Sequence, residues 1–98
     1  MRPTLYGDVA CAARVLYRLP QMEWEATCRR MICEADIADR YRDLHQKVHP
    51  RYGNGSLMSV ARMRSLPPEP FFDDPDYCAC FEMVLRQVRE YWIRSRRS

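Results

Sequence analysis

The chain has 98 residues, of which 47% are hydrophobic and 30% charged, and its formal net charge is +3. This length predicts one domain, 1–98, too small to enclose a deep active-site cleft, and the composition excludes a disordered chain. The charge is mildly basic and falls short of that of a dedicated nucleic-acid binder. All but one of the 16 basic residues are arginines, which a GC-rich genome accounts for more simply than phosphate recognition does.

The cysteines and the hydrophobic runs predict a cytoplasmic protein. The five cysteines are odd in number and form no CxxC motif. We therefore expect reduced thiols, with Cys11, Cys28 and Cys78 on the apolar faces of helices. Arg14 and Arg18 interrupt the only apolar run near the N-terminus, which argues against a signal peptide. No run approaches the ~18 apolar residues of a membrane span, so no membrane partner is expected.

The first predicted helix runs from Asp8, its cap, to Leu19. Pro20 ends it, and the short connection predicts that the next helix packs against it in the antiparallel sense. The apolar face of this helix comprises Val9, Ala12, Ala13, Leu16 and Leu19.

The second predicted helix, from residue 20 or 21 to residue 45 or 46, is apolar on two opposite faces. One face comprises Trp24, Cys28, Met31, Ala35 and Ala38. The other, about 200° round the helix, comprises Ala26, Cys33, Ile37 and Leu44. Such a helix is either sandwiched within its own bundle or covered by another molecule. The leading hypothesis is that the second face binds a protein partner or a further copy in a homo-oligomer. The i,i+4 ion pairs expected on the polar face are Glu25–Arg29, Asp36–Arg40 and Asp43–Lys47.

A loop over 48–55 precedes a short third helix. Gly53-Asn54-Gly55 predicts a turn with positive φ, and Ser56 is placed to cap a helix from Leu57 to about Arg64. A stiff proline-rich stretch, 66–70, follows. Phe71 or Phe72 is then expected to pack against Cys78 or Phe81 at the start of the next helix.

The last predicted helix starts at Asp74-Pro75 and runs to about Arg94, with 95–98 as a frayed tail. Its apolar residues form one broad stripe that must be buried: Tyr77, Cys78, Phe81, Val84, Leu85, Val88 and Trp92. The fold class is therefore all-α, a compact four-helix bundle in which helices 2 and 4 are long and helices 1 and 3 short. The aromatic residues expected to anchor the core and the loops are Trp24, Tyr52, Phe71, Phe72 and Trp92.

No catalytic, cofactor or metal residue is predicted. Cys78 and Cys80 lie about 200° apart on one helix, so they cannot chelate a single ion together with His45 and His49. The sequence places no nucleophile beside a base. We expect no enzymatic activity, no cofactor and no small-molecule substrate. The acidic residues that indicate a solvated face rather than an acid–base pair are Asp36, Asp39 and Asp43.

Arginines support an alternative function, a nucleic-acid-associated adaptor with salt-sensitive phosphate contacts. One set shares an arc of the last helix, beside the apolar stripe, and another surrounds Tyr52. Pairs of Arg86 with Glu82 and Glu90 would neutralise part of the first set. The candidate contacts are Arg86, Arg89, Arg96 and Arg97 in the first set, and Arg51, Arg62 and Arg64 in the second.

Four stretches together resemble a family of small uncharacterised proteins from Rhodobacter-type alphaproteobacteria. They are Met1-Arg2-Pro3 with Gly7-Asp8, Glu34-Ala35-Asp36 through Arg42, His49-Pro50 with Gly53 to Met58, and Pro68-Glu69-Pro70 with Asp74 to Tyr77. The resemblance covers nearly the whole chain and implies no activity or site residue. The chain also resembles a small-terminase-like component of a phage-derived gene transfer agent. It departs from that group in lacking the helix-turn-helix with which many phage small terminases begin. We interpret the chain as a non-enzymatic helical interaction module.

Overall fold

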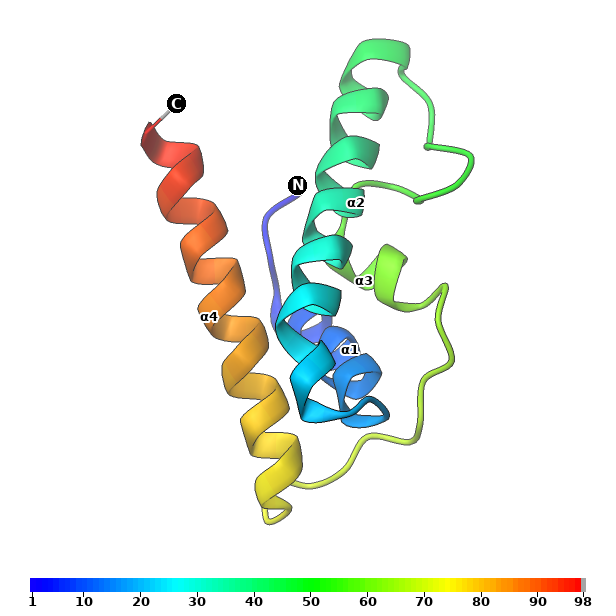
Figure 1. The fold of residues 1–98 in the computed structure, drawn as a ribbon. Coiled ribbons are helices and arrows are strands. Elements are labelled where there is room, and N and C mark those ends of the chain that lie inside the picture. Colours follow the sequence, from blue (N-terminus) through cyan, green and yellow to red (C-terminus); the bar gives the residue numbers. More distant parts are fainter. Residues whose placement is uncertain (98) are drawn as a thin grey trace.

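The computed structural model describes the backbone of residues 1–97 and the side chains of residues 1–95. Its elements are α1 (Tyr6–Tyr17), η1 (Gln21–Glu23), α2 (Trp24–His45), α3 (Leu57–Ala61) and α4 (Pro75–Arg97). The predicted all-α class is confirmed, with two long helices and two short ones. In Figure 1, the pair α1 and α2 lies between α4 on one side and α3 on the other. The N-terminal segment runs between α4 and α2.

The core forms around α1 and one face of α2. Ala12, Ala13 and Leu16 of α1 are completely buried. The first predicted face of α2 is confirmed, because all five of its residues are buried: Trp24, Cys28, Met31, Ala35 and Ala38. The small residues Cys28, Ala35 and Ala38 let neighbouring helices approach α2 closely, and the larger Trp24 and Met31 fill the remaining space of the core.

α1 begins two residues earlier than predicted, and Asp8 is not its cap. Asp8 lies one turn inside the helix and is 5% exposed. Its carboxylate accepts hydrogen bonds from the backbone N–H groups of Leu5 and Met58, each at 2.8 Å. A carboxylate at this position can satisfy the free N–H of the cap residue as in a capping box. Asp8 therefore ties the start of α1 to the start of α3.

α2 is preceded by the 3₁₀ turn η1 and ends at His45, because Gln46 adopts a left-handed conformation with φ of 57°. Two of the predicted i,i+4 ion pairs are present, Glu25–Arg29 at 3.5 Å and Asp36–Arg40 at 3.0 Å. The third, Asp43–Lys47, does not form, because Lys47 lies beyond the helix end and is no longer one turn away.

The third helix is shorter than predicted, although its cap is confirmed. Ser56 Oγ accepts from the N–H of Ser59 at 3.1 Å. The guanidinium of Arg64 bonds the Val60 carbonyl at 3.1 Å, and so satisfies a carbonyl that a longer helix would have used. Gly53 and Gly55 have φ of 84° and 94°, as the turn prediction requires.

The buried face of α4 is not centred on the predicted apolar stripe. Its innermost residues are Tyr77, Cys80, Val84, Gln87 and Val88. At 100° per residue, the centre of this buried face lies roughly 70° round from the centre of the stripe. Cys80 is consequently buried in place of Cys78, and Leu85 is 48% exposed.

The ends of α4 also differ from expectation. Phe72 packs on Tyr77 and Phe81, with ring centroids 5.4 and 5.2 Å apart, so it is the predicted staple. Phe71 is 82% exposed, and its expected anchoring role is wrong. α4 continues to Arg97, three residues beyond the predicted end, and so includes most of the expected tail. Ser98 lies outside the described residues.

Candidate protein-interaction surface

The N-terminal segment is held in place at several points. The Met1 ammonium group contacts Asp36 Oδ1 at 2.7 Å, Tyr91 Oη at 2.8 Å and Asp39 Oδ2 at 3.4 Å. Trp92 Nε1 donates to Thr4 Oγ1 at 3.2 Å. Tyr91 and Trp92 both belong to α4, so these contacts hold the N-terminal segment against that helix.

The electrostatics of this anchor follow from its geometry. Burial by itself raises the pKa of Asp36, but hydrogen bonds from the Met1 ammonium and Tyr91, with the charges of the ammonium and Arg40, hold the pKa below its ordinary value. Burial and the bond to Asp36 raise the pKa of Tyr91 to about 12. Asp36 and Asp39 are therefore structural contacts, and not the solvated face expected from the sequence.

An apolar groove of about 310 Å³ runs between the N-terminal segment and α4. One wall comes from the segment and α1: Thr4, Leu5, Tyr6 and Val9. The other wall comes from α4: Phe81, Leu85, Val88 and Trp92. Among the described residues, no charged side chain lines this groove. We call this feature, with these eight residues, the α4 groove.

Large side chains of the α4 groove remain in contact with solvent. Leu5 is 71% exposed and Tyr6 is 60% exposed. Phe81 and Trp92 are half-buried. Contiguous exposed aliphatic and aromatic side chains are uncommon on monomeric proteins and mark interaction surfaces. Aromatic side chains such as these are also the residues that contribute most to protein–protein binding.

Polar contacts fix one end of the groove. Glu69 Oε2 accepts from Tyr77 Oη at 2.8 Å and from Tyr6 Oη at 3.3 Å. Burial and the interaction with Glu69 raise the pKa of both Tyr77 and Tyr6, so both hydroxyls remain donors. The Tyr6 ring lies 5.8 Å from that of Phe81, centroid to centroid. The walls of the groove are thus joined by side chains from three parts of the chain.

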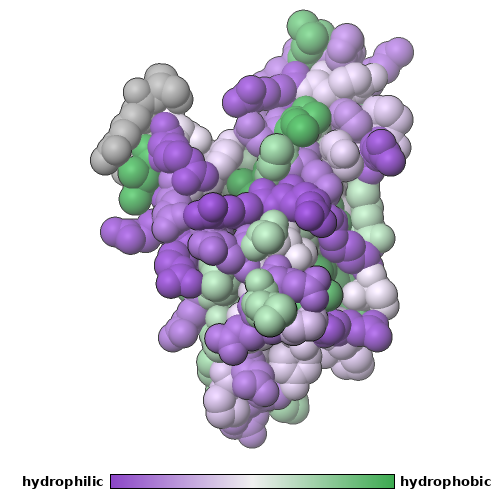
Figure 2. Space-filling view, viewed as in Figure 1, coloured by the Kyte–Doolittle hydropathy of each residue, from purple (hydrophilic) through white to green (hydrophobic). Residues whose placement is uncertain are grey.

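The predicted interface on α2 is exposed in the single chain. Ile37 is 44% exposed and Leu44 is 77% exposed, and both Ala26 and Cys33 face solvent. On the face seen in Figure 2, hydrophobic residues form separate small patches among hydrophilic ones. Arg30 and Arg40 share this side of α2 at 100° per residue, so the four residues do not form a continuous apolar strip.

The structure separates the two predicted sets of arginines. Arg86 and Arg89 lie on α4 and Arg62 follows α3, on opposite sides of the molecule in Figure 1. Arg51 is exposed, whereas Arg64 is half-buried and pairs with Glu34 at 3.2 Å. Arg96 and Arg97 belong to α4, but their side chains lie outside the described residues.

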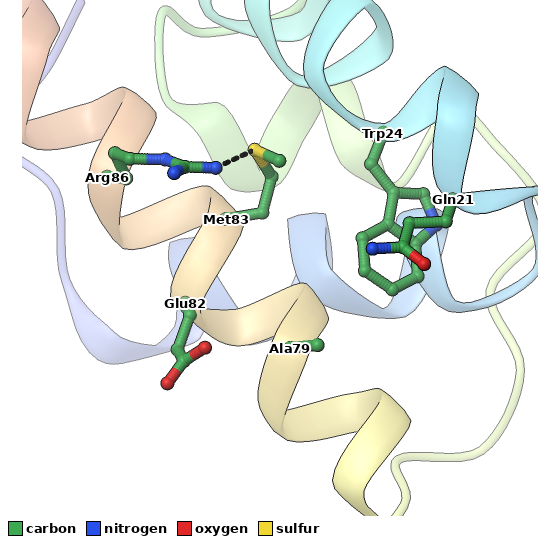
Figure 3. A pocket seen from close by; sticks show the side chains of 6 residues that line it. All are labelled: Gln21, Trp24, Ala79, Glu82, Met83 and Arg86. Carbon is green, nitrogen blue, oxygen red and sulfur yellow. Dashed lines mark hydrogen bonds between the residues drawn. The ribbon is translucent and has the colours of Figure 1, made fainter.

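Arg86 does not form the ion pairs expected with Glu82 and Glu90. Its guanidinium instead contacts Met83 Sδ at 3.4 Å, at the edge of a hollow of about 260 Å³ between η1, α2 and α4. Figure 3 shows the Glu82 side chain pointing away from this contact and from Trp24 on the opposite wall. Glu82, Arg86 and Arg89 thus make no ion pair with any other described side chain.

The two cysteines and the two histidines considered as metal ligands belong to different parts of the fold, the cysteines to α4 and the histidines to the end of α2 and the loop after it. Cys78 Sγ donates to the Phe72 carbonyl at 3.0 Å, whereas Cys80 is buried and its pKa is raised by burial to about 11. His45 and His49 both pack on Tyr41, with centroids 4.4 and 4.8 Å away. Among the described residues, no three histidine, cysteine or acidic side chains are grouped so that they could hold a metal ion. Within the same residues, no helix is long and apolar enough to cross a membrane.

A family model described as a domain of unknown function (DUF7742) matches residues 2–88. The chain belongs to this family. The match includes the N-terminal wall of the α4 groove and all of its α4 wall except Trp92. Searches of curated proteins and of solved structures found no match. The expected membership of an uncharacterised family is confirmed, while the bacterial source and the link to gene transfer agents remain predictions.

Sequence reasoning missed the α4 groove for two reasons. It placed Leu5 and Tyr6 ahead of the first helix, and it treated the whole α4 stripe as buried. The available signal was the width of that stripe. Tyr77, Val84 and Val88 define one side of it, and Cys78 and Leu85 the other, which is more than one neighbouring helix can cover.

Proposed function

We propose that this protein is a non-enzymatic helical interaction module that self-associates or binds a protein partner. The observation that supports this most directly is the α4 groove, in which exposed Leu5, Tyr6 and Leu85 flank half-buried Phe81 and Trp92. Covering these side chains would remove apolar surface from water at a gain of roughly 25 cal/mol per Å². The second surface in the proposal is the exposed set on α2: Ala26, Cys33, Ile37 and Leu44.

The cellular setting that fits this proposal is the cytoplasm. All five cysteines are free thiols, and three of them are buried: Cys11, Cys28 and Cys80. Reduced, buried cysteines are typical of proteins that work in a reducing compartment.

Site-specific photocrosslinking in cells of the source organism tests the function. A photoreactive phenylalanine analogue at Leu85 should yield a covalent protein adduct that mass spectrometry can identify. The matched control is the same analogue at Met22, which is 90% exposed but lies outside the groove. Absence of a protein adduct from position 85, or equal adducts from both positions, would contradict the proposal.

A second candidate function is a nucleic-acid-associated adaptor of the phage-derived DNA-packaging type. The observation in its favour is that Arg86 and Arg89 are exposed and make no ion pair with a described carboxylate. Binding through such residues would be mostly to phosphates and weakly sequence-specific.

A salt titration of DNA binding decides this alternative. Fluorescence anisotropy with a labelled duplex should give log K falling linearly with log salt concentration, and each arginine replaced by glutamine should reduce the slope by about 0.9. The residues to replace are Arg86, Arg89, Arg51 and Arg62. No binding at low salt, or a slope that none of these replacements changes, would rule the adaptor out.

A further inference from the structure

We propose that the α4 groove binds a second copy of this chain, with the two α4 helices packed antiparallel about a two-fold axis. This inference rests on the proposed function and names its partner. The axis lies near Arg86 and Gln87, so that each copy contributes the same patch, as in an isologous dimer.

α4 carries two seams with the spacing of a coiled coil, both apolar except for Gln87 in the inner one. The inner seam is Tyr77, Cys80, Val84, Gln87 and Tyr91, at intervals of 3, 4, 3 and 4 residues, and it packs against α1 and α2. The outer seam is Cys78, Phe81, Leu85, Val88 and Trp92, at the same intervals. That spacing is the a/d pattern by which one helix packs along another. Val88 belongs to both the core and the groove, since it is 8% exposed and lines the groove. The N-terminal segment borders the outer seam, through Thr4 at Trp92 and Tyr6 at Phe81, and leaves Leu85 48% exposed.

The charges beside the outer seam select an antiparallel second copy. Glu82 and Arg89 each follow a d-type residue, Phe81 and Val88, and therefore occupy e positions seven residues apart. In an antiparallel pair, e positions of the two helices face each other. With Leu85 opposite Val88 of the second copy, Glu82 of each chain lies beside Arg89 of the other.

A parallel arrangement would not use these charges. There, e positions face g positions, which in α4 are Tyr77, Val84 and Tyr91. Tyr77 and Val84 are completely buried against the protein's own core. Glu82 and Arg89, by contrast, are exposed and pair with no other described side chain. The antiparallel dimer forms two symmetric ion pairs from charges that the single chain leaves unmatched, which favours this partner and this register.

The rest of the groove suits the same arrangement. In this register Phe81 lies opposite Trp92 of the second copy, which places an aromatic pair on each side of the axis. Leu5 and Tyr6 form the outer wall of the groove, where they flank the incoming helix and lose their exposure. The dimer thus covers the aromatic and aliphatic side chains that the single chain leaves in water.

The experiment is a sedimentation and light-scattering series on the full chain from micromolar to millimolar concentration. We expect a species of twice the 11.7 kDa chain mass, abolished by Leu85→Asp. Glu82→Arg and Arg89→Glu should each raise the dimer dissociation constant at least roughly tenfold, because like charges then face each other. The double reversal should return it to within roughly twofold of the wild-type value. Far-ultraviolet circular dichroism checks that each variant is folded.

The control variant is Met22→Asp, which alters an apolar side chain that is 90% exposed and lies outside the groove, and which should leave the dimer intact. Leu44→Asp tests the α2 surface as the alternative site of association. A chain that stays monomeric, a dimer lost through Leu44→Asp but not Leu85→Asp, or a dimer that the double reversal fails to restore would each overturn the inference. The proposed function is judged separately by the photocrosslink at position 85. An adduct with a different protein retains that function but overturns this inference, whereas no adduct removes both.

Discussion

We expect replacement of the Asp8 side chain to destabilise the fold strongly. Its two carboxylate oxygens accept from the N–H of Leu5 and the N–H of Met58, each at 2.8 Å, and the side chain is 5% exposed. Asp8→Ala leaves both amide groups without this acceptor. Because Leu5 belongs to the α4 groove, the same change loosens one wall of the proposed interface.

The magnitude follows from the two lost hydrogen bonds. Each bond to a charged acceptor contributes about 1.5–3 kcal/mol, and a buried donor left unsatisfied costs a similar amount. Because both bonds are only partly buried, Asp8→Ala should lower the free energy of unfolding by about 3–4 kcal/mol, near the lower end of the sum of the two. Asp8→Asn keeps one acceptor and should lower it by about 1–3 kcal/mol. A domain of this size is stable by only about 5–15 kcal/mol, so the alanine variant should lose a large share of its stability.

Urea denaturation followed by circular dichroism measures both variants. The matched control is Asp43→Ala, an exposed acid on α2, which should change the free energy of unfolding by less than about 0.5 kcal/mol. If Asp8→Ala costs no more than this control, the carboxylate does not hold the two helix starts together, and the reasoning is refuted.

Three further outcomes are expected. The pKa of Asp36 is lowered in the folded protein, so its contribution to stability is present above about pH 4 and is lost as pH falls through the folded pKa. The difference in urea midpoint between wild type and Asp36→Asn should therefore be larger at pH 7 than at pH 3. An unchanged difference would contradict this. Gly55→Ala should cost more than about 1 kcal/mol in thermal or urea unfolding, because φ is +94° and a new Cβ would lie 2.8 Å from Asp39 Cα; the milder control is Gly7→Ala, whose Cβ meets only the flexible methyl end of Met58. In native protein at pH 8, iodoacetamide should modify exposed Cys33 long before Cys28, whose pKa burial raises to about 12, and peptide mapping that finds Cys28 labelled first would show that this part of the core opens.

Local patterns were sufficient where one helix and its caps decide the outcome. The buried face of α2 from Trp24 to Ala38, the Ser56 cap and the positive φ of Gly53 and Gly55 were all predicted from residue type and spacing. These features depend on side-chain volume, a hydroxyl within reach of an amide and the absence of a Cβ. None of them requires knowledge of a distant part of the chain.

The predicted start of α1 and the predicted third ion pair of α2 were wrong. In each case residue spacing allowed two arrangements, and a contact or backbone conformation elsewhere decided between them. Asp8 can cap from outside a helix or from its first turn, and the Met58 amide, fifty residues away, favours the second. Asp43 and Lys47 have a favourable spacing, but Gln46 in the left-handed conformation takes Lys47 out of the helix.

The amino-acid sequence by itself determined that this protein is a helical bundle and which residues could form each apolar face, since helix periodicity is a property of the chain. Only the tertiary structure decided which part of each face is buried. α1 and α2 meet α4 along Tyr77, Cys80 and Val84, and so leave Leu85 and Phe81 at the edge with Leu5 and Tyr6. The rotation of one helix against its neighbours depends on the volumes of all the side chains between them, and spacing along a single helix does not contain that information.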